Sequence, residues 1–350
     1  MSLEEILRGA VGKGASDIFL VAGQPLSYKL NGLIEKQSDQ PINPAMLEEL
    51  VDAMYTFAKR DAVYREHGDD DFSISIPSVG RFRINIYKQR GSWSAVLRVV
   101  SFELQDVSDM GIPQTILNMG NKKKGMILVT GPAGSGKSTT LAYIIDHINK
   151  TRNCHILTLE DPIEFLHKHT KSIVSQREIG IDSPNYSRAL KAAMRESPDV
   201  ILIGEMRDLE TIEVAMTAAE TGHLVLSTLH TLGAANTIDR IIDVFPPEQQ
   251  QQIRVQLAMV LQSVVSQQLL PSKDGSLVPA FEILQANNAV RTLIRDGKVH
   301  QINSTISTSA EEGMVAMDKS ILNLYKQGII DEMTALSHCI NREMMERNLR

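Results

Sequence analysis

The segment 131–139 has the residue types and spacing of a loop that binds phosphate groups. Its residues are Gly131, Pro132, Ala133, Gly134, Ser135, Gly136, Lys137, Ser138 and Thr139. Glycines let the backbone point its N–H groups inward, and a helix that begins after the loop adds the positive end of its dipole. A lysine and a serine at these places reach the β- and γ-phosphates and a Mg²⁺ ion. The segment therefore predicts a site for ATP and Mg²⁺, with Ser138 as a metal ligand.

The residues on either side of the loop predict the elements that such a site requires. Residues 126–129 form an apolar run of strand length, and apolar residues recur at helical spacing after Leu141. Glycine, lysine and serine also occur together in ordinary loops. The full spacing between a strand and a helix favours nucleotide binding over that interpretation.

Three further apolar runs are followed by side chains that could act on a bound triphosphate. These side chains are Glu164, Glu205 and His230. If the runs are strands parallel to the one before the loop, their carboxyl ends meet at one edge of the sheet. Glu205 would then activate the attacking water, with Glu164 assisting near the metal and His230 close by.

Each of these residues also has a plainer interpretation. A carboxylate after a strand often caps the next helix, as we expect for Asp208. A single histidine such as His230 is more often structural than catalytic. Gly204 stands where many enzymes with this loop carry a strand-end aspartate. Glu205 is therefore the main candidate for the hydrolytic carboxylate.

The order of predicted elements divides the chain into two domains. Residues 1–100 contain short alternating strands, one of them over 26–34, and a long helix over 44–67, which predicts a small α+β domain. Residues 101–112 are rich in Asp, Ser and Gly and are predicted to be a linker. From 113 to 350 strands and helices alternate, which predicts an α/β domain with a parallel sheet and a helical C-terminal part. A strand pair is expected near 265–285.

Composition is that of an ordinary globular protein. The 350 residues are 43% hydrophobic and 22% charged, with a formal net charge of −6. This acidic balance argues against direct binding to nucleic acid. The N-terminal segment is acidic rather than a signal peptide, and no apolar run reaches membrane-spanning length. The two cysteines, Cys154 and Cys339, lie far apart and exclude a four-cysteine zinc site. These features predict a cytoplasmic protein.

The first domain contains three arginines that we expect on one surface. Arg81 and Arg83 alternate with apolar residues, and so does Arg98 in the next run. If the two runs form a hairpin, their apolar faces coincide and the three arginines share the opposite face. They could contact a triphosphate or a neighbouring subunit, or simply form a solvated face.

These motifs resemble those of the secretion and type IV pilus ATPases, and within them the PilT-type retraction ATPases. The resemblance covers nearly the whole chain and rests on segments that occur in the family's order. They are Gly80–Asn85, the phosphate loop, the aspartate box at Leu157–Phe165, the Walker B region at Gly204–Thr211 and the histidine box at Thr221–Thr231. Gly204 in place of an aspartate is a trait of this family.

The resemblance implies roles for individual residues and for the assembly. It makes Glu205 the Walker B glutamate, Glu164 the aspartate-box glutamate and His230 the histidine-box residue. Arg81, Arg83 and Arg98 become arginines of the first domain that approach nucleotide. The family has a PAS-like first domain and a RecA-like second domain. It forms homohexameric rings in the cytoplasm, at the inner face of the cell membrane, where they dock on an inner-membrane platform protein of the pilus machinery.

The retraction subtype rests on two further features. The chain lacks the long N-terminal extension and the four-cysteine motif of assembly and secretion ATPases. Residues 289–296 resemble a signature of the retraction subfamily, and helical spacing would place Arg291 and Arg295 on one exposed face. We expect this face to meet the pilus machinery. The segment could also be an ordinary amphipathic helix.

Three other functions stay open. The first is a pilus assembly or type II secretion ATPase of the same fold. The second is a RecA-like ATPase that handles DNA, which the acidic balance disfavours. The third is an inactive nucleotide-binding partner of another motor, which the intact carboxylates disfavour. Departures from the family pattern at Phe19, Asn31 and Trp93 concern nucleotide contacts of the first domain.

Overall fold

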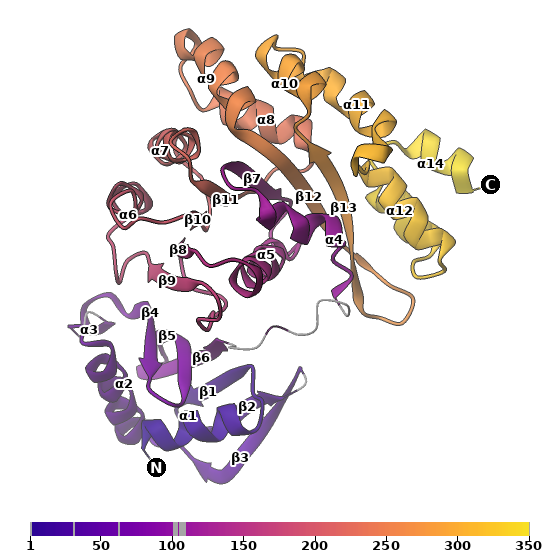
Figure 1. The fold of residues 1–350 in the computed structure, drawn as a ribbon. Helices are drawn as coiled ribbons and strands as arrows, with labels where there is room; N and C mark the ends of the chain where they lie inside the picture. Colours follow the sequence, from indigo (N-terminus) through magenta and orange to yellow (C-terminus); the bar gives the residue numbers. More distant parts are fainter. Residues whose placement is uncertain (1, 31, 62–63, 101–103, 105–109, 350) are drawn as a thin grey trace. The chain divides into compact units, whose positions relative to one another are not determined.

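The computed structural model divides into two compact units (Figure 1). It describes residues 2–30, 32–61, 64–100, 104 and 110–349. The first unit combines Met1–Glu103 with Pro162–Leu166, and the second holds Leu104–Asp161 and His167–Arg350. The predicted linker at 101–112 lies mostly outside the described residues, so the predicted domain boundaries stay predictions.

In its described part, the first unit is an antiparallel sheet of six strands with helices against it (Figure 1). The strand order is β3-β2-β1-β6-β5-β4. The strands are β1 (Asp17–Val21), β2 (Pro25–Leu30), β3 (Leu33–Pro41), β4 (Asp69–Ile76), β5 (Gly80–Gln89) and β6 (Ser92–Val100). The helices are α1 (Leu3–Gly12), α2 (Pro44–Ala58) and α3 (Tyr64–His67).

Local sequence explains these elements and two departures from prediction. Phe82, Ile84 and Ile86 alternate with polar residues along β5 and are fully buried, as period-two patterning requires. Residues 26–34, predicted as one strand, turn at Gly32, whose φ is +83°. The helix predicted over 44–67 is interrupted after Ala58, because Lys59 adopts a left-handed conformation that ends α2.

The second unit is built on a seven-stranded sheet in its described part. The order is β13-β12-β7-β11-β10-β8-β9, and neighbours are parallel except for the antiparallel pair β12–β13. The strands are β7 (Gly125–Thr130), β8 (His155–Glu160), β9 (Ile173–Glu178), β10 (Val200–Ile203), β11 (Leu224–Leu229), β12 (Leu261–Pro271) and β13 (Leu277–Gln285). The α/β class and the strand pair near 265–285 are confirmed.

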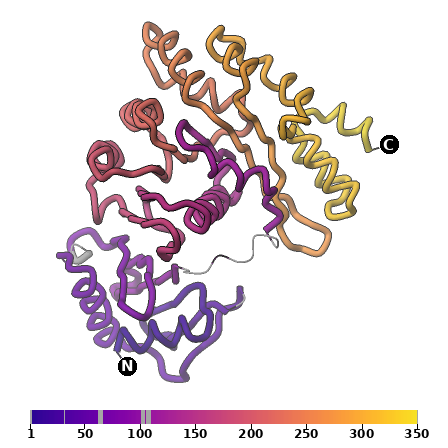
Figure 2. Tube along the Cα trace, viewed as in Figure 1, coloured from indigo at the N-terminus to yellow at the C-terminus, as the bar shows by residue number. Residues whose placement is uncertain are grey.

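Helices cover both faces of this sheet (Figure 2). Alternate residues of β10 point to opposite faces: Val200 and Leu202 join a buried cluster with α5, whereas Ile201 and Ile203 join one with α6 to α10. The helices near the strands are α4 (Gln114–Leu117), α5 (Lys137–Thr151), α6 (Tyr186–Ala193), α7 (Leu209–Glu220), α8 (Ala234–Asp243) and α9 (Pro247–Val260). The C-terminal helices are α10 (Asn288–Arg295), α11 (Ile302–Thr308), α12 (Met317–Lys326), α13 (Glu332–His338) and α14 (Arg342–Leu349).

Strand β9 was not predicted from the sequence. Only Val174 and Glu178 of its six residues are buried, which is the pattern of an edge strand without the long apolar run of the central strands. None of the helices in the described ranges combines the length and the apolar character that crossing a bilayer requires.

Arg291 does not lie on the exposed face that the sequence predicted. It is half-buried, and its guanidinium donates hydrogen bonds to the backbone oxygens of Ala258 and, at 2.9 Å, Met259. Helix α9 ends there and passes directly into β12, so its last carbonyls have no partner within the helix. Arg291 supplies hydrogen-bond donors to two of these carbonyls. Burial lowers the pKa of its guanidinium. Arg295 is exposed, as predicted.

We predict that Arg291→Ala lowers the free energy of unfolding by about 1–3 kcal/mol, because it leaves half-buried carbonyls without donors. Arg295→Ala, on the exposed side of the same helix, should change it by less than about 0.5 kcal/mol. Urea denaturation of the two variants measures the difference. Equal stabilities would contradict the structural role of Arg291.

Candidate functional site

The phosphate loop joins the end of β7 to the first turn of α5 and packs tightly against β12. Gly131, Gly134 and Gly136 have φ values of +144°, +75° and +83°, which glycine adopts without strain. A Cβ atom on Gly131 would lie 2.2 Å from the backbone oxygen of Gln267 on β12. A side chain at that position would therefore push the loop away from the sheet.

Polar groups inside the loop are arranged to meet an anion. The Lys137 side chain folds back over the loop, where its Nζ donates to the backbone oxygens of Gly131 (3.0 Å) and Pro132 (2.9 Å). The Ser135 hydroxyl is buried and has no hydrogen-bond partner among the described residues. Thr140, one turn further, donates to the Gln267 amide oxygen at 2.7 Å and ties α5 to β12. This loop fits a nucleotide phosphate chain.

The same loop fits a magnesium ion bound with the nucleotide. Mg²⁺ commonly takes one or two oxygens from protein and the rest from phosphates and water. Ser138 lies in the first turn of α5, directly after Lys137, and is half-buried. Its hydroxyl is the oxygen that this loop offers to the metal.

Glu205 and His230 meet at the edge where β10 and β11 end. The Glu205 Oε2 atom lies 2.6 Å from the Arg207 Nε and 3.4 Å from the His230 Nε2. The Glu205 side chain is 15% exposed, whereas that of Arg207 is 74% exposed. The expected meeting of Glu205 and His230 is thus confirmed, although their chemical roles stay predictions. Arg207, which lies nearer to the Glu205 carboxylate than His230 does, was not singled out in the sequence.

The missing strand-end aspartate has a steric explanation. A Cβ atom on Gly204 would lie 2.7 Å from the hydroxyl of Tyr186, at the start of α6, and 3.3 Å from the backbone oxygen of Leu159. Any side chain at this position would displace the tyrosine. The first position after β10 that can hold a carboxylate is therefore one residue further along the chain, at Glu205.

Tyr186 is a second residue of the site that sequence analysis missed. Burial raises the pKa of its phenol, and the nearby carboxylates of Asp161, Glu205 and Glu160 raise it further. The phenol therefore stays protonated at neutral pH. The sequence signal for its position was Asn185, a residue type that caps helices, which places Tyr186 at the first turn of α6.

The other predicted residues belong to the first unit. Glu164 lies in the segment Pro162–Leu166, which groups with that unit, so its approach to the phosphate loop remains a prediction. Arg83 and Arg98 are paired directly across β5 and β6, and Arg81 is two residues away on the same face. The shared arginine surface is therefore confirmed.

Each end of this arginine row has a partner within the first unit. Arg98 donates to the carboxylate of Asp17 on β1 at 3.0 Å, and Arg81 donates to the Ser75 hydroxyl at 2.8 Å. Arg83 is exposed and stands opposite another arginine, and such like-charge pairs across strands are destabilising. An anion that contacts the row would relieve this repulsion.

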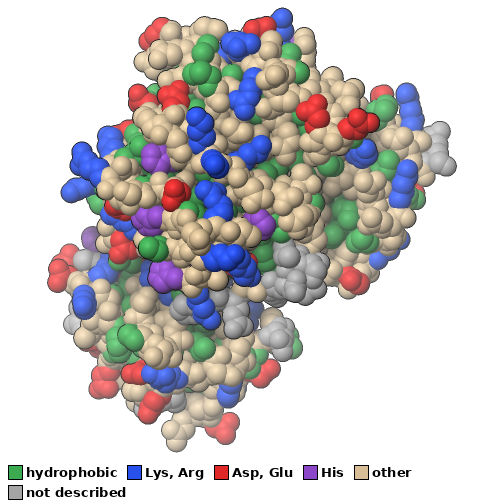
Figure 3. Space-filling model, in the orientation of Figure 1, with side chains coloured by type: hydrophobic (Ala, Val, Ile, Leu, Met, Phe, Trp, Pro, Cys, Tyr) green, Lys and Arg blue, Asp and Glu red, His purple; other side chains and the backbone are tan. Residues whose placement is uncertain are grey.

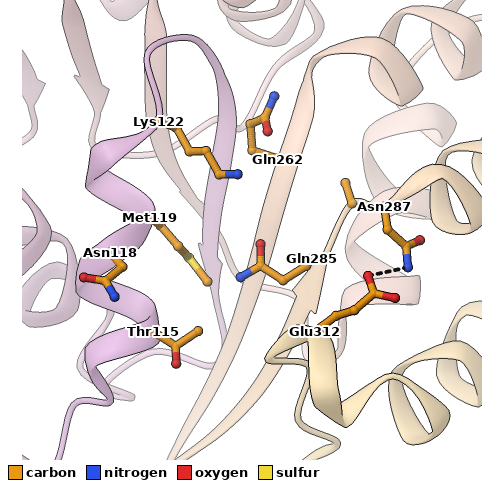
Figure 4. Close-up of a pocket in the computed structure, with 9 residues that line it drawn as sticks. Thr115, Asn118, Met119, Lys122, Gln262, Gln285, Asn287 and Glu312 are labelled. Atoms are coloured by element: carbon orange, nitrogen blue, oxygen red, sulfur yellow. Dashed lines mark hydrogen bonds between the residues drawn. The ribbon is translucent and has the colours of Figure 1, made fainter.

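A separate cavity of about 480 Å³ lies at the opposite end of the strands in the second unit (Figure 4). Lys122, before β7, and Glu312 line it on opposite sides, with the amides of Gln262 and Gln285 between them. No residue of the predicted catalytic set lines it. On the visible face of the molecule, acidic and basic side chains are interspersed (Figure 3).

Comparisons with known proteins agree with this geometry. A sequence profile of the family described as type II/IV secretion system protein matches residues 1–330. The type IV pilus retraction ATPase PilT of Pseudomonas aeruginosa is 43% identical over 336 residues, which cover 96% of this chain and 97% of that protein. A twitching motility protein of Neisseria gonorrhoeae is 46% identical over 306 residues, covering 86% and 82%.

A solved structure supports the same relationship. The crystal structure of the pilus retraction motor PilT with bound ADP superposes with a TM-score of 0.88 and 45% sequence identity. It covers 99% of both chains.

We predict that Gly204→Ala lowers the free energy of unfolding by about 1–3 kcal/mol, because the new methyl group meets the Tyr186 hydroxyl. Adding Tyr186→Phe removes that oxygen and should restore part of the loss in a double-mutant cycle. Gly12→Ala is a matched control, since its Cβ would meet nothing within 4 Å. Thermal or urea unfolding gives the values. No coupling between positions 186 and 204 would refute the steric explanation.

Proposed function

The chain belongs to the type II/IV secretion system protein family, and we propose that it is the ATPase that powers retraction of a type IV pilus. The single observation that carries the ATPase assignment is the order β7-β11-β10 in a parallel sheet. This order brings the phosphate loop and Glu205 to one edge, two strands apart. Likeness to PilT over nearly the full length of both chains supports retraction as the work performed.

The residues at this edge can divide the work of hydrolysis. The loop N–H groups and Lys137 bind and orient the phosphates, and Lys137 must exchange its carbonyl partners for phosphate oxygens. Glu205 accepts a proton from the attacking water. Its carboxylate first has to leave Arg207, whose exposed side chain can move into solvent. His230 remains beside Glu205 and can hold its orientation.

Mg²⁺ would be held by Ser138 with Glu164 nearby, and it would neutralise charge on the phosphates during transfer. This assignment goes beyond the homologues described above, whose names mention no metal. Hydrolysis that depends on Mg²⁺ and fails in Ser138→Ala would support it.

We further propose that the active form is a homohexameric ring. Phosphoryl transfer commonly uses an arginine to stabilise charge in the transition state. Arg83, with its like-charged neighbour Arg98 and with Arg81 beside them, can supply one from an adjacent subunit. Docked on an inner-membrane platform protein, the ring would work at the cytoplasmic face of the membrane. Light scattering after size-exclusion chromatography tests the hexamer.

The rival functions predict different observations. A pilus assembly or type II secretion ATPase would share every feature of the phosphate loop and Glu205. A RecA-like DNA-handling ATPase would show turnover stimulated by DNA. An inactive partner would bind nucleotide without hydrolysing it. The likeness to PilT favours retraction among these.

We predict that Glu205→Gln keeps nucleotide binding but lowers ATP turnover by about 10²-fold or more, the scale of a general base. The substitution is isosteric, so the loop that binds phosphates is unchanged. Glu210→Gln on α7, an exposed carboxylate paired with Lys191, is the control and should turn over normally. Wild-type turnover by the purified Glu205 variant would refute the assignment.

Deletion of the gene separates retraction from assembly. We expect deleted cells to carry many surface pili and to lose twitching motility, because pili are built but not withdrawn. Complementation with the wild-type chain should restore motility, whereas the Glu205→Gln chain should not. Cells without pili would identify an assembly ATPase instead.

A further inference from the structure

A cavity of about 360 Å³ lies beside Glu205 at the carboxyl ends of β10 and β11. Its polar lining comes from two strand ends and one helix. The charged or titratable residues are Glu205, Arg207, His230 and Arg240. Ile212 on α7 and Val244 after α8 form apolar parts of its wall.

The charges of this cavity are unbalanced. Two guanidinium groups and an imidazole face one carboxylate, and that carboxylate is already paired with Arg207. Arg240, in the last turn of α8, forms no ion pair within the described ranges. The cavity therefore carries a net positive charge and guanidinium donors of the kind that bind phosphate oxygens in pairs.

The cavity and the phosphate loop lie on different sides of Glu205. Helix α5, which begins at the loop, packs on one face of the sheet, whereas α7 and α8, which line the cavity, pack on the other. Glu205 comes from the strand-end edge between those faces. Phosphate released beside Glu205 on the side of the loop would thus meet the cavity on the other side of the same carboxylate.

Helix α8 is anchored so that Arg240 is held in place. The N–H of Ala234, at its first turn, donates to the buried carboxylate of Glu282 on β13 at 2.7 Å. The N–H of Gly233 donates to the Ser266 hydroxyl on β12 at 2.8 Å. Burial raises the pKa of Glu282. The start of the helix is therefore fixed to β12 and β13, the two strands on one side of β7.

We infer that this cavity binds the inorganic phosphate that ATP hydrolysis produces, before the phosphate leaves the protein. The inference rests on the proposed ATPase function. Water adds to the γ-phosphorus, the bond to the ADP oxygen breaks, and the proton of the water passes to Glu205. The hydrogen phosphate then leaves the loop and binds to Arg240 and Arg207. Glu205, which now carries that proton, no longer pairs with Arg207, so the Arg207 guanidinium is available to the phosphate.

Titration of inorganic phosphate into the full-length protein saturated with MgADP tests this inference by calorimetry. ADP occupies the α- and β-phosphate positions of the loop, and the loss of two charge-assisted bonds in Arg240→Ala should weaken phosphate binding by about tenfold or more. Arg240→Lys keeps the positive charge but loses the paired N–H donors of the guanidinium. Its phosphate affinity should lie between those of the wild type and Arg240→Ala. Arg347→Ala, an exposed arginine on α14, should bind phosphate as the wild type does.

Two results would overturn the inference. One is equal phosphate affinity in the wild type and Arg240→Ala, and the other is no phosphate binding to the wild-type ADP complex. Arg240 is exposed, so thermal unfolding should show that its variants remain folded. Absence of ATP turnover in the wild type would instead refute the proposed function. The binding measurement does not depend on turnover, so the two failures are distinguishable.

Discussion

The parallel alignment of β7, β11, β10 and β8 is the constraint on which the candidate site depends. Parallel strands end at the same edge, so sheet topology brings the loop after β7 and Glu205 after β10 to one edge. All four strands are buried on both faces, which fixes their register. The proposed catalytic groups are thus placed by the buried central strands of the second unit.

Close packing around this edge decides which residue after β10 can have a carboxylate side chain. The Tyr186 hydroxyl occupies the space beside Gly204 and leaves no room for a side chain. Glu205, one residue later, extends from the strand end toward Arg207 and His230. This pairing occupies the carboxylate, so the proposed hydrolysis requires its release from Arg207 first.

Much of this arrangement could be predicted from the sequence because it is local or periodic. The spacing of residues 131–139 specifies the phosphate loop, and alternation along β5 and β6 places Arg81, Arg83 and Arg98 on one face. Contacts between distant segments could not be predicted. Arg291 reads as a surface residue of an amphipathic helix, yet it caps α9, more than thirty residues earlier. Tyr186 likewise touches Gly204 only through the packing of α6 on the strand ends.

The most direct test of the account is a structure of the full-length chain with Mg²⁺, ADP and a fluoride analogue of the γ-phosphate. The account predicts that the ion pair between Glu205 and Arg207 is broken. A Glu205 carboxylate oxygen should then lie within hydrogen-bond distance of a water in line with the analogue. A structure in which the analogue is bound and Glu205 remains paired with Arg207, with no water between Glu205 and the analogue, would contradict it.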